Sequence, residues 1–351
     1  MKEISYNILF FSLLIIFFEI CLNSEIKYNH TSLENNLVFV FSTFRHGARH
    51  PFVDVDYFGN QISEKGKLTP YGEIQHLEIG KKYRERYSNF LDMNFNPKQM
   101  YIRSSDIGRT ITSTLKQLEG LFNKTIKSEN LDIIKNGWKF WELFQLNQTQ
   151  RNKSDKYFEY CDNIDQKRHL SNIDNIFPIL KICFGLNKAP NIAHFCDSAF
   201  AAYFEYTYNN QTNNKIGKCG KESADKLHQF CINTFDTYKG WDEKAAYMFY
   251  TFFKNILKYM SDAIEGKSEI KMVMIGGHEI TVDRFMDFLD GLKIIPRTHY
   301  PHYACNIVIE LRKYNNEFFL EFYYNDILKY NETLEYLNHF LVQKIFLILL
   351  L

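Results

Sequence analysis

The run Arg45-His46-Gly47-Ala48-Arg49-His50-Pro51 combines residue types that phosphate chemistry uses. A histidine can act as a nucleophile, and a guanidinium stays charged and offers a fork of donors to pairs of phosphate oxygens. Glycine at position 47 lets the backbone pass close to a ligand. The run therefore predicts an anion site built around His46, with Arg45 and Arg49 as anion-binding groups.

Two distant segments carry polar groups of the same kind. Arg103 follows the short apolar segment Met100-Tyr101-Ile102, and the pair His278-Glu279 follows the apolar run from Ile270 to Ile275. In open α/β sheets, ligands bind beyond the carboxyl ends of the strands. We therefore expect these groups to meet the first run in one pocket, where three guanidiniums around two imidazoles suit a tetrahedral dianion.

The apolar pattern predicts the elements that position the first run. Leu37 to Thr43 is continuously apolar apart from its last two residues, which predicts a strand buried on both faces of a parallel sheet. A helix is expected to begin further on, because Thr69 suits an N-cap and Pro70 suits the first helical position.

The second arginine segment is expected to form a strand, a loop and a helix. The strand covers 100–102, and Ser105 or Asp106 is expected to cap the helix that reaches Phe122. Arg109 is interpreted as a structural residue within this helix.

The later part of the chain continues the alternation of helices and strands. Trp241 to Ile264 predicts a helix that Gly266 ends. The strand at 270–275 is followed by another helix, and two apolar segments, Cys305 to Leu311 and Phe318 to Tyr324, predict a hairpin.

Together these patterns predict an α/β fold with a mostly parallel central sheet flanked by helices. The α/β domain is expected to be discontinuous, covering 25–122 and 265–340. The segment 123–264 is irregular and polar for most of its length, and we expect it to form an inserted, mainly helical cap subdomain.

The N-terminal segment 1–24 has the features of a secretory signal peptide, with an apolar stretch from Ile8 to Phe18 that is shorter than a bilayer span. An uncleaved anchor is the alternative. An even set of six further cysteines suggests up to three disulfides, as in exported proteins; they are Cys161, Cys183, Cys196, Cys219, Cys231 and Cys305. Glycosylation sequons agree with export and occur at Asn29, Asn123, Asn147, Asn152, Asn210 and Asn331.

Charge and the C-terminal segment exclude other classes of protein. The 42 Lys and Arg residues nearly balance the 41 Asp and Glu residues, so no overall field attracts nucleic acid. The apolar tail at 341–351 is too short to span a bilayer and lacks the signals of a lipid anchor, so the sequence does not predict membrane association. The segment His278 to Val282 lacks the second histidine of a zinc-protease helix.

The run Arg45-His46-Gly47-x-Arg49-x-Pro51 resembles the motif of the histidine acid phosphatase family, the branch of the histidine phosphatase superfamily that includes acid phosphatases and phytases. Arg103-Ser104-Ser105-Asp106 with Arg109-Thr110 is similar to that family's second arginine segment. His278-Glu279 stands where the family has a His-Asp pair. The resemblance covers roughly 37–114 and 270–325, whereas the insert is family-like only in its position.

The resemblance implies hydrolysis of phosphate monoesters in two steps through a phosphohistidine, without a metal or other cofactor. His46 is expected to be the nucleophile. Glu279 is expected to protonate the leaving alcohol and then to help water attack. The phosphate oxygens are expected to be held by Arg45, Arg49, Arg103 and His278.

Glu279 departs from the aspartate that the family's acid phosphatases usually carry. Its extra methylene could shift the carboxyl by about 1 Å, a displacement that can cost ~100-fold in rate. Asp106 is the next candidate for the acid. The alternative that this departure suggests is a phosphate-ligand-binding glycoprotein with weakened catalysis. Because the sequence does not indicate the substrate, a phytase-like inositol phosphate phosphatase is a further alternative.

The expected partner is a small-molecule phosphomonoester, or a phosphorylated protein or lipid, and not nucleic acid. The expected location is the extracellular space or a lysosomal or vacuolar lumen. The sequence does not indicate an oligomeric state.

Overall fold

The computed structural model describes most of the predicted α/β domain and little of the predicted cap. The predicted signal peptide, the C-terminal tail and most of the segment between 146 and 242 lie outside the described residues. None of the helices in the described ranges is long and apolar enough to cross a bilayer. The described residues are 36–52, 61–137, 139–145, 195–196, 220–235, 243–292, 294–296, 300–335 and 337.

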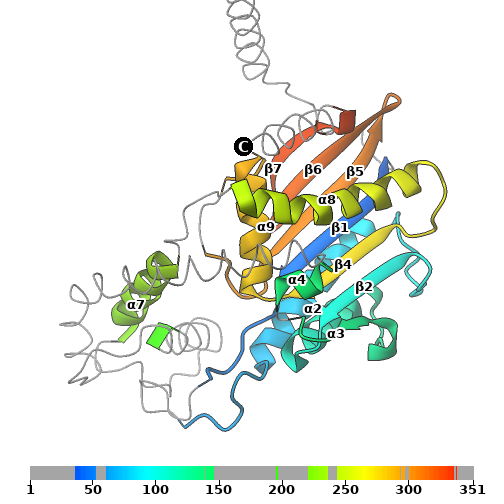
Figure 1. Ribbon diagram of the computed structural model, residues 1–351. Coiled ribbons are helices and arrows are strands. Elements are labelled where there is room, and N and C mark those ends of the chain that lie inside the picture. Colours follow the sequence, from blue (N-terminus) through cyan, green and yellow to red (C-terminus); the bar gives the residue numbers. More distant parts are fainter. Residues whose placement is uncertain are drawn as a thin grey trace, which may run out of the picture. The chain divides into compact units, whose positions relative to one another are not determined.

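One mixed sheet organises the described part of the chain, with strand order β3-β2-β4-β1-β5-β6-β7 (Figure 1). The first four strands in this order are parallel, and β5, β6 and β7 continue the sheet antiparallel. The predicted mostly parallel sheet is thus correct for one half only. The strands are β1 (Leu37–Arg45), β2 (Met100–Ser105), β3 (Asp132–Ile134), β4 (Met272–Gly277), β5 (Asn306–Tyr314), β6 (Glu317–Tyr324) and β7 (Ile327–Thr333).

Strand β1 lies inside the sheet and is buried on both faces, as its apolar run predicts. It pairs with β4 on one side and with β5 on the other. Because successive side chains of a strand point to opposite faces, Phe39 and Phe41 enter one hydrophobic cluster, while Val40 enters another. The two clusters are the cores on the two faces of the sheet.

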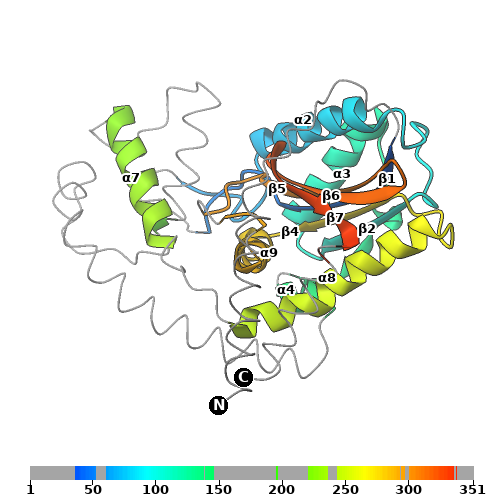
Figure 2. The same ribbon diagram turned by 90° about the horizontal axis from the view of Figure 1, so that it is seen from above.

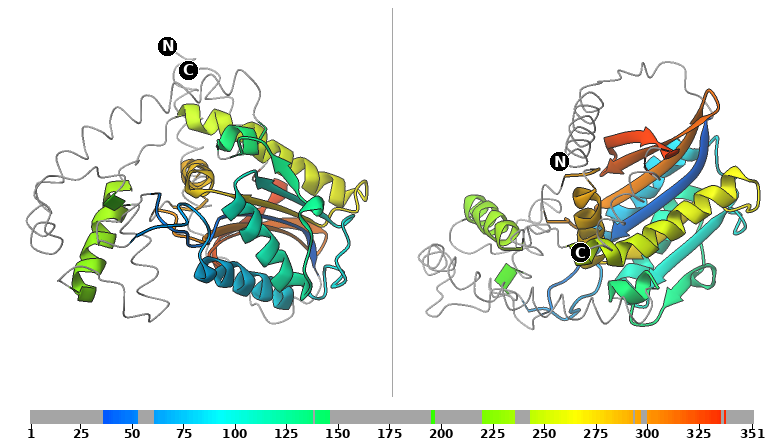
Figure 3. Two further views of the ribbon diagram at one scale, coloured as in Figure 1. Left: turned by 90° about the horizontal axis from the view of Figure 1, so that it is seen from below. Right: turned by 45° about the horizontal axis from the view of Figure 1, so that its top comes forward.

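Helices cover both faces (Figures 2 and 3). One face is covered by α2 (Pro70–Tyr87) and α3 (Gly108–Phe122), which share the cluster of Val40. The other face is covered by α8 (Glu243–Ile264) and α9 (Glu279–Gly291), which share the cluster of Phe39 and Phe41. Short elements also occur: a 3-10 helix at Ser128–Asn130 and α4 (Phe140–Leu143).

Several predicted boundaries are confirmed. Thr69 caps α2, because its Oγ1 accepts a hydrogen bond from Gly72 N at 3.1 Å. Gly266, with φ of +67°, follows the end of α8. The hairpin between β5 and β6 turns at Asn315 and Asn316, which both have positive φ.

The N-cap of α3 differs from the prediction. Ile107 occupies the cap position without a side-chain hydrogen bond to the helix. Ser105 Oγ instead lies 2.9 Å from His278 Nε2, and Asp106 Oδ2 accepts a hydrogen bond from Asn136 N at 3.0 Å. Both expected capping side chains therefore have partners outside α3.

Two elements within the predicted cap segment 123–264 lie with the sheet. Strand β3 pairs with β2, with Arg103 opposite Asp132. Helix α8 packs on β1, where the rings of Phe41 and Phe252 are 5.7 Å apart. The sheet domain is therefore larger than the predicted 25–122 and 265–340.

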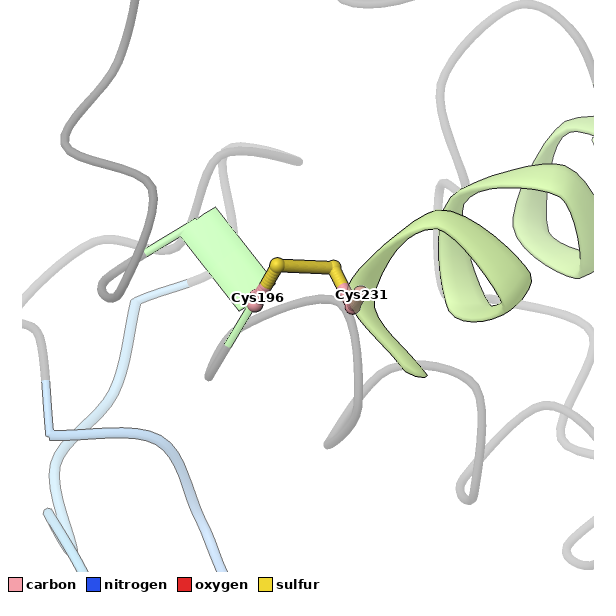
Figure 4. Close-up of a disulfide and its surroundings, with 2 residues drawn as sticks. All are labelled: Cys196 and Cys231. Atoms are coloured by element: carbon pink, nitrogen blue, oxygen red, sulfur yellow. A yellow bond between two sulfur atoms is a disulfide. The ribbon is translucent and has the colours of Figure 1, made fainter. Parts of the chain in front are cut away.

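The cysteines only partly follow the prediction of paired thiols. Cys196 and Cys231 form a disulfide with a Cα–Cα distance of 5.3 Å (Figure 4), and Cys231 belongs to α7 (Gly220–Phe235). Cys305 is free and buried just before β5, so it does not join a three-disulfide set. The remaining cysteines of the set, at 161, 183 and 219, lie outside the described residues.

Candidate active site

The ends of three parallel strands meet at one edge of the sheet. In the register of the strands, Arg45 is opposite Gly277, and Ser104 is opposite Gly276. His46 N continues the pairing by donating to Gly277 O at 3.0 Å. The expected convergence of the first run with the His278 segment is therefore observed.

Two hydrogen bonds define the protonation of the His46 ring. Its Nδ1 lies 2.8 Å from Gly47 O, and Arg109 Nε lies 3.0 Å from its Nε2. A carbonyl oxygen only accepts and a guanidinium only donates, so Nδ1 carries the proton and Nε2 carries the lone pair. His46 is thus held as a neutral imidazole with its lone pair on Nε2.

The surroundings of His46 keep this ring neutral in acid. The side chain is fully buried, and burial, with Arg109 and His278 adding to it, holds the pKa of His46 well below its usual range. The lone pair on Nε2 therefore persists at pH values where an exposed histidine is protonated.

His278 forms a second imidazole beside the first. Its ring centroid is 5.4 Å from that of His46, its Nε2 lies 2.9 Å from Ser105 Oγ, and its Nδ1 lies 3.4 Å from Arg109 Nη2. Burial lowers the pKa of His278 to about 4; Glu279 opposes this and Arg109 adds to it. The ring stands just before α9, at the carboxyl end of β4.

Arg45 is buried and is fixed from the loop before β5. Its Nη1 donates to Pro301 O at 2.7 Å, and its guanidinium carbon lies 4.2 Å from the centroid of the Tyr303 ring and 5.5 Å from that of Tyr300. Its Nε lies 3.4 Å from Glu279 Oε2. The guanidinium is therefore held in place by a carbonyl, aromatic faces and a carboxylate.

The Glu279 carboxylate lies close to His46, although the residue departs from the expected aspartate. Its Oε2 lies 4.0 Å from His46 Nε2, and 36% of the side chain is exposed. Burial raises the pKa of Glu279, but Arg45, His278 and Arg49 together outweigh burial and bring it to about 2. Glu279, the first residue of α9, is thus an ionised and partly exposed carboxylate.

The roles predicted for the two arginines of the second segment are reversed. Arg103 was expected in the site and Arg109 was expected to be structural. Arg109 contacts both imidazoles, and burial, followed by Arg49, lowers its pKa to about 10. Arg103 is engaged elsewhere: its Nε donates to Asp132 at 3.1 Å and its Nη1 to Leu143 O at 3.0 Å. The structure therefore brings Arg109, and not Arg103, to the histidines.

The reason is the length of β2. We placed the end of the strand at Ile102, whereas β2 continues to Ser105, so that Arg103 lies within the strand and Ser105 lies at its end. Arg109 stands in the first turn of α3. Helix N-termini are common anion sites, so the position of Arg109 at the start of a predicted helix was a usable signal.

Arg49 is the third arginine that acts on the two histidines, with Arg45 and Arg109. It is buried, its Nη1 donates to His50 O at 3.0 Å, and its guanidinium carbon lies 4.1 Å from the centre of the Phe52 ring. The Arg109 guanidinium carbon lies 5.2 Å from the centre of the same ring. Phe52 was not singled out from the sequence.

Helices α2 and α3 support the loop that carries His46. Gly47 N donates to Ser113 Oγ at 3.0 Å, and Ala48 N donates to Gln75 Oε1 at 2.8 Å. A Cβ at position 47 would lie 2.3 Å from Gly72 O. Glycine is therefore required here for packing against α2, in addition to any approach to a ligand.

The donor set also has the composition of a metal site, since ligand atoms of His46, His278 and Glu279 lie within 4.8 Å of one another. However, Arg45, Arg49 and Arg109 all contribute positive potential at these groups. Such a field opposes a cation and favours an anion. The geometry is that of an oxyanion site with a neutral imidazole inside it.

Comparison with known proteins agrees with this geometry. The model of the histidine phosphatase superfamily, branch 2, matches residues 26–325. Prostatic acid phosphatase of Bos taurus is 24% identical over 323 residues, covering 84% of this chain and 78% of that protein. Lysosomal acid phosphatase of Homo sapiens is 37% identical over 91 residues, covering 25% of this chain and 22% of that protein.

A solved structure shares the fold. The phytase from D. castellii matches with a TM-score of 0.59 at 14% identity, covering 88% of this chain and 80% of that chain. The family match spans most of the sequence and includes all three strand ends of the site. The chain therefore belongs to branch 2 of the histidine phosphatase superfamily and is a hydrolase of phosphate monoesters.

Proposed function

We propose that this chain is an acid phosphatase that works through a phosphohistidine on Nε2 of His46. The observation that carries the proposal is a pair of hydrogen bonds: His46 Nδ1–H donates to Gly47 O, and Arg109 Nε donates to His46 Nε2, which therefore carries the lone pair. A nucleophile that stays neutral under acidic conditions suits turnover at low pH. The oxyanion-binding groups that we assign are Arg45, Arg49, Arg109 and His278.

In the first step, the Nε2 lone pair attacks phosphorus and the bond to the leaving oxygen breaks. The three equatorial oxygens carry the charge of a loose transition state, and the guanidiniums and His278 stabilise it. The ring becomes a cation as the N–P bond forms. Its Nδ1–H already donates to Gly47 O at 2.8 Å, which stabilises that cation without any movement.

Glu279 supplies the proton of the first step. Its low pKa arises from Arg45, His278 and Arg49 acting against burial. A bound phosphate ester places negative charge among these groups. This charge raises the pKa of Glu279, so that the carboxyl is protonated in the complex with the ester. The proton then goes to the leaving oxygen.

In the second step, a water molecule attacks phosphorus from the side that the alcohol has vacated. Glu279, now a carboxylate, takes the proton of this water, and the N–P electrons return to Nε2 of His46. The products are inorganic phosphate and the original neutral ring. Glu279 is therefore the acid of the first step and the base of the second. This is expected because the second step resembles the reverse of the first, with water in place of the alcohol.

Two alternatives differ in the leaving group or in the rate. A phosphate-binding glycoprotein with weak catalysis was suggested by the glutamate at 279, yet that carboxylate lies 3.4 Å from Arg45 Nε and 4.0 Å from His46 Nε2. Hydrolysis of inositol phosphates is the other alternative, and the fold shared with the D. castellii phytase is compatible with it. We also propose that the protein acts in an exported or lysosome-like compartment. The insert is proposed to form a cap subdomain over the site.

A substrate panel tests the proposal. The purified protein is assayed with an aryl phosphate, glycerol 2-phosphate, phosphotyrosine peptide and inositol hexakisphosphate from about pH 4 to 8, a range that brackets the histidine pKa of ~6.5. The proposal expects turnover that is highest in the acidic half. Vanadate binding without turnover of any ester would contradict it and favour the weakened binding protein.

A further inference from the structure

Phe52 lies at the rim of the site, one residue beyond the Arg45–Pro51 run. Its relative exposure is 51%, which is unusual for a large apolar side chain in the described ranges, while His46 is fully buried. His46 is thus buried, whereas Phe52 is partly exposed.

The ring of Phe52 is built into the site. Its centre lies 4.1 Å from the guanidinium carbon of Arg49 and 5.2 Å from that of Arg109. Gly66 packs on the same ring, since a Cβ there would lie 2.2 Å from Phe52 Cε1, and Gly66 O lies 3.4 Å from Arg109 Nη1. The ring therefore contacts both arginines and the loop at Gly66, while about half of the residue remains exposed to solvent.

The direction of the reaction brings the leaving group to this rim. In an in-line displacement, the leaving oxygen is on the side of phosphorus opposite to the attacking atom. Because His46 is fully buried, we infer that the leaving group lies on the more exposed side of phosphorus. Glu279 and Phe52 are partly exposed and lie beside the arginines of the site, so we expect them on that side.

We propose that Phe52 is a specificity-determining residue that contacts the leaving group and favours phosphate monoesters with an aromatic or flat apolar group next to the phosphate. Ring-on-ring contact stabilises such a leaving group, whereas a leaving group bearing further phosphates would place its charges against an apolar edge. The inference rests on the proposed function, because it assumes attack by His46.

Steady-state kinetics of Phe52→Leu and Phe52→Trp test it. Leucine keeps the apolar volume without an aromatic face, and tryptophan keeps the face. The measured quantity is the ratio of kcat/KM for p-nitrophenyl phosphate to kcat/KM for glycerol 2-phosphate, together with the inhibition constant of inorganic phosphate. Ile327→Ala is the control, since Ile327 is equally apolar, is 60% exposed and lies on the edge strand β7.

The proposal expects the ratio to fall roughly three- to tenfold in Phe52→Leu, the range of an aromatic pair, and to recover in Phe52→Trp. The inhibition constant of phosphate should change far less than the ratio. An unchanged ratio would overturn the proposal, and so would equal losses for both esters and for phosphate, because Phe52 would then act only by positioning the arginines. Absence of turnover by the unaltered protein would instead refute the proposed function itself.

Discussion

Arg103 and Arg109 are six residues apart, yet their side chains have different surroundings. Arg109 contacts both imidazoles, whereas Arg103 contacts Asp132 and the carbonyl of Leu143. An arginine whose donors are used by a carboxylate and a carbonyl stabilises the strands that it joins. An arginine that contacts His46 can bind the oxyanion if His46 is the nucleophile, as we propose.

The two arginines are expected to behave differently when replaced by alanine. Arg109→Ala should lower kcat/KM by about 10²- to 10³-fold, the effect of losing one oxyanion donor. Arg103→Ala should retain most activity and lose roughly 1–3 kcal/mol of unfolding free energy, since it removes the charged hydrogen bonds to Asp132 and to the Leu143 carbonyl. Kinetics and chemical denaturation of both variants distinguish these effects, and the opposite pattern would restore Arg103 to the site.

Glu279 is tested by the choice of leaving group. Glu279→Gln cannot donate a proton, so it should lose about 10²- to 10⁴-fold in kcat for glycerol 2-phosphate, whose alkoxide must be protonated. The loss should be much smaller for p-nitrophenyl phosphate, whose leaving phenolate is stable without a proton. Equal losses for the two esters would contradict the role of Glu279 as the acid.

At the scale of residues, the sequence led to His46, Arg45, Arg49, His278 and Glu279 because each lies within a few residues of the end of a predicted strand and belongs to a segment that resembles the family's motifs. Arg109 was misjudged because the strand before it was predicted three residues too short. Phe52 gave no signal, since an exposed phenylalanine after a proline has no characteristic pattern. Its position emerges only from the loop that brings Gly66 against it.

At the scale of elements, the close approach of α2 and α3 supports the loop of His46. Gly80 and Gly120 face each other across this contact, and a Cβ at position 80 would lie 2.1 Å from Gln117 O. The same two helices hold Gly47 and Ala48 through Ser113 and Gln75. Their spacing therefore affects both stability and the placement of the loop that carries His46.

Gly80→Ala tests this spacing. The added methyl meets backbone on α3 and cannot be relieved by a rotamer change, so we expect a loss of about 1–3 kcal/mol of unfolding free energy. Gly108→Ala is the matched control, because nothing lies within 4 Å of a Cβ there and the residue is helical. Denaturant titration should leave Gly108→Ala at or above the stability of the unaltered protein. A neutral Gly80→Ala would contradict the tight contact.

Elements with a clear pattern of apolar residues, such as β1 and α8, were predicted well from the sequence. The edge strands β3 and β7 were not predicted. β7 is exposed at most of its positions, so its residues show no alternation, and β3 is only three residues long. The turn before β7 nevertheless has a signal in the sequence, because Asn and Asp tolerate positive φ in turns. Asn325 and Asp326 both adopt it. The N-cap of α3 was misassigned because Ser105 and Asp106 bind partners that are distant in sequence.

At the scale of the whole molecule, a set of buried histidines couples stability to pH. His76 is fully buried, with its Nε2 3.2 Å from Arg45 O and its Nδ1 2.9 Å from the side-chain amide of Gln117, which can donate or accept. Burial lowers the pKa of His76 to about 4, while its hydrogen bonds oppose this, and burial also lowers the pKa of His278 to about 4. In the unfolded chain each would titrate near ~6.5.

The sign of the effect follows from these pKa values. Between pH ~6.5 and about 4 the unfolded chain binds protons that the folded chain does not, so the folded state loses stability as the pH falls through this window. Each such histidine contributes up to ~1.4 kcal/mol per pH unit. His76→Gln should therefore show a shallower decline of unfolding free energy than the unaltered protein in the same window. Parallel declines, measured by denaturant titration at several pH values, would contradict a neutral buried His76.

The central claim is that Nε2 of His46 receives the phosphoryl group, and rapid-quench trapping tests it most directly. The protein is mixed with an ester that carries a labelled phosphoryl group, quenched in alkaline denaturant and examined for label bound to protein. We predict a label that is stable to alkali, is released by acid, is absent in His46→Ala and persists in His50→Ala. Label retained by His46→Ala, or turnover by that variant, would contradict the account.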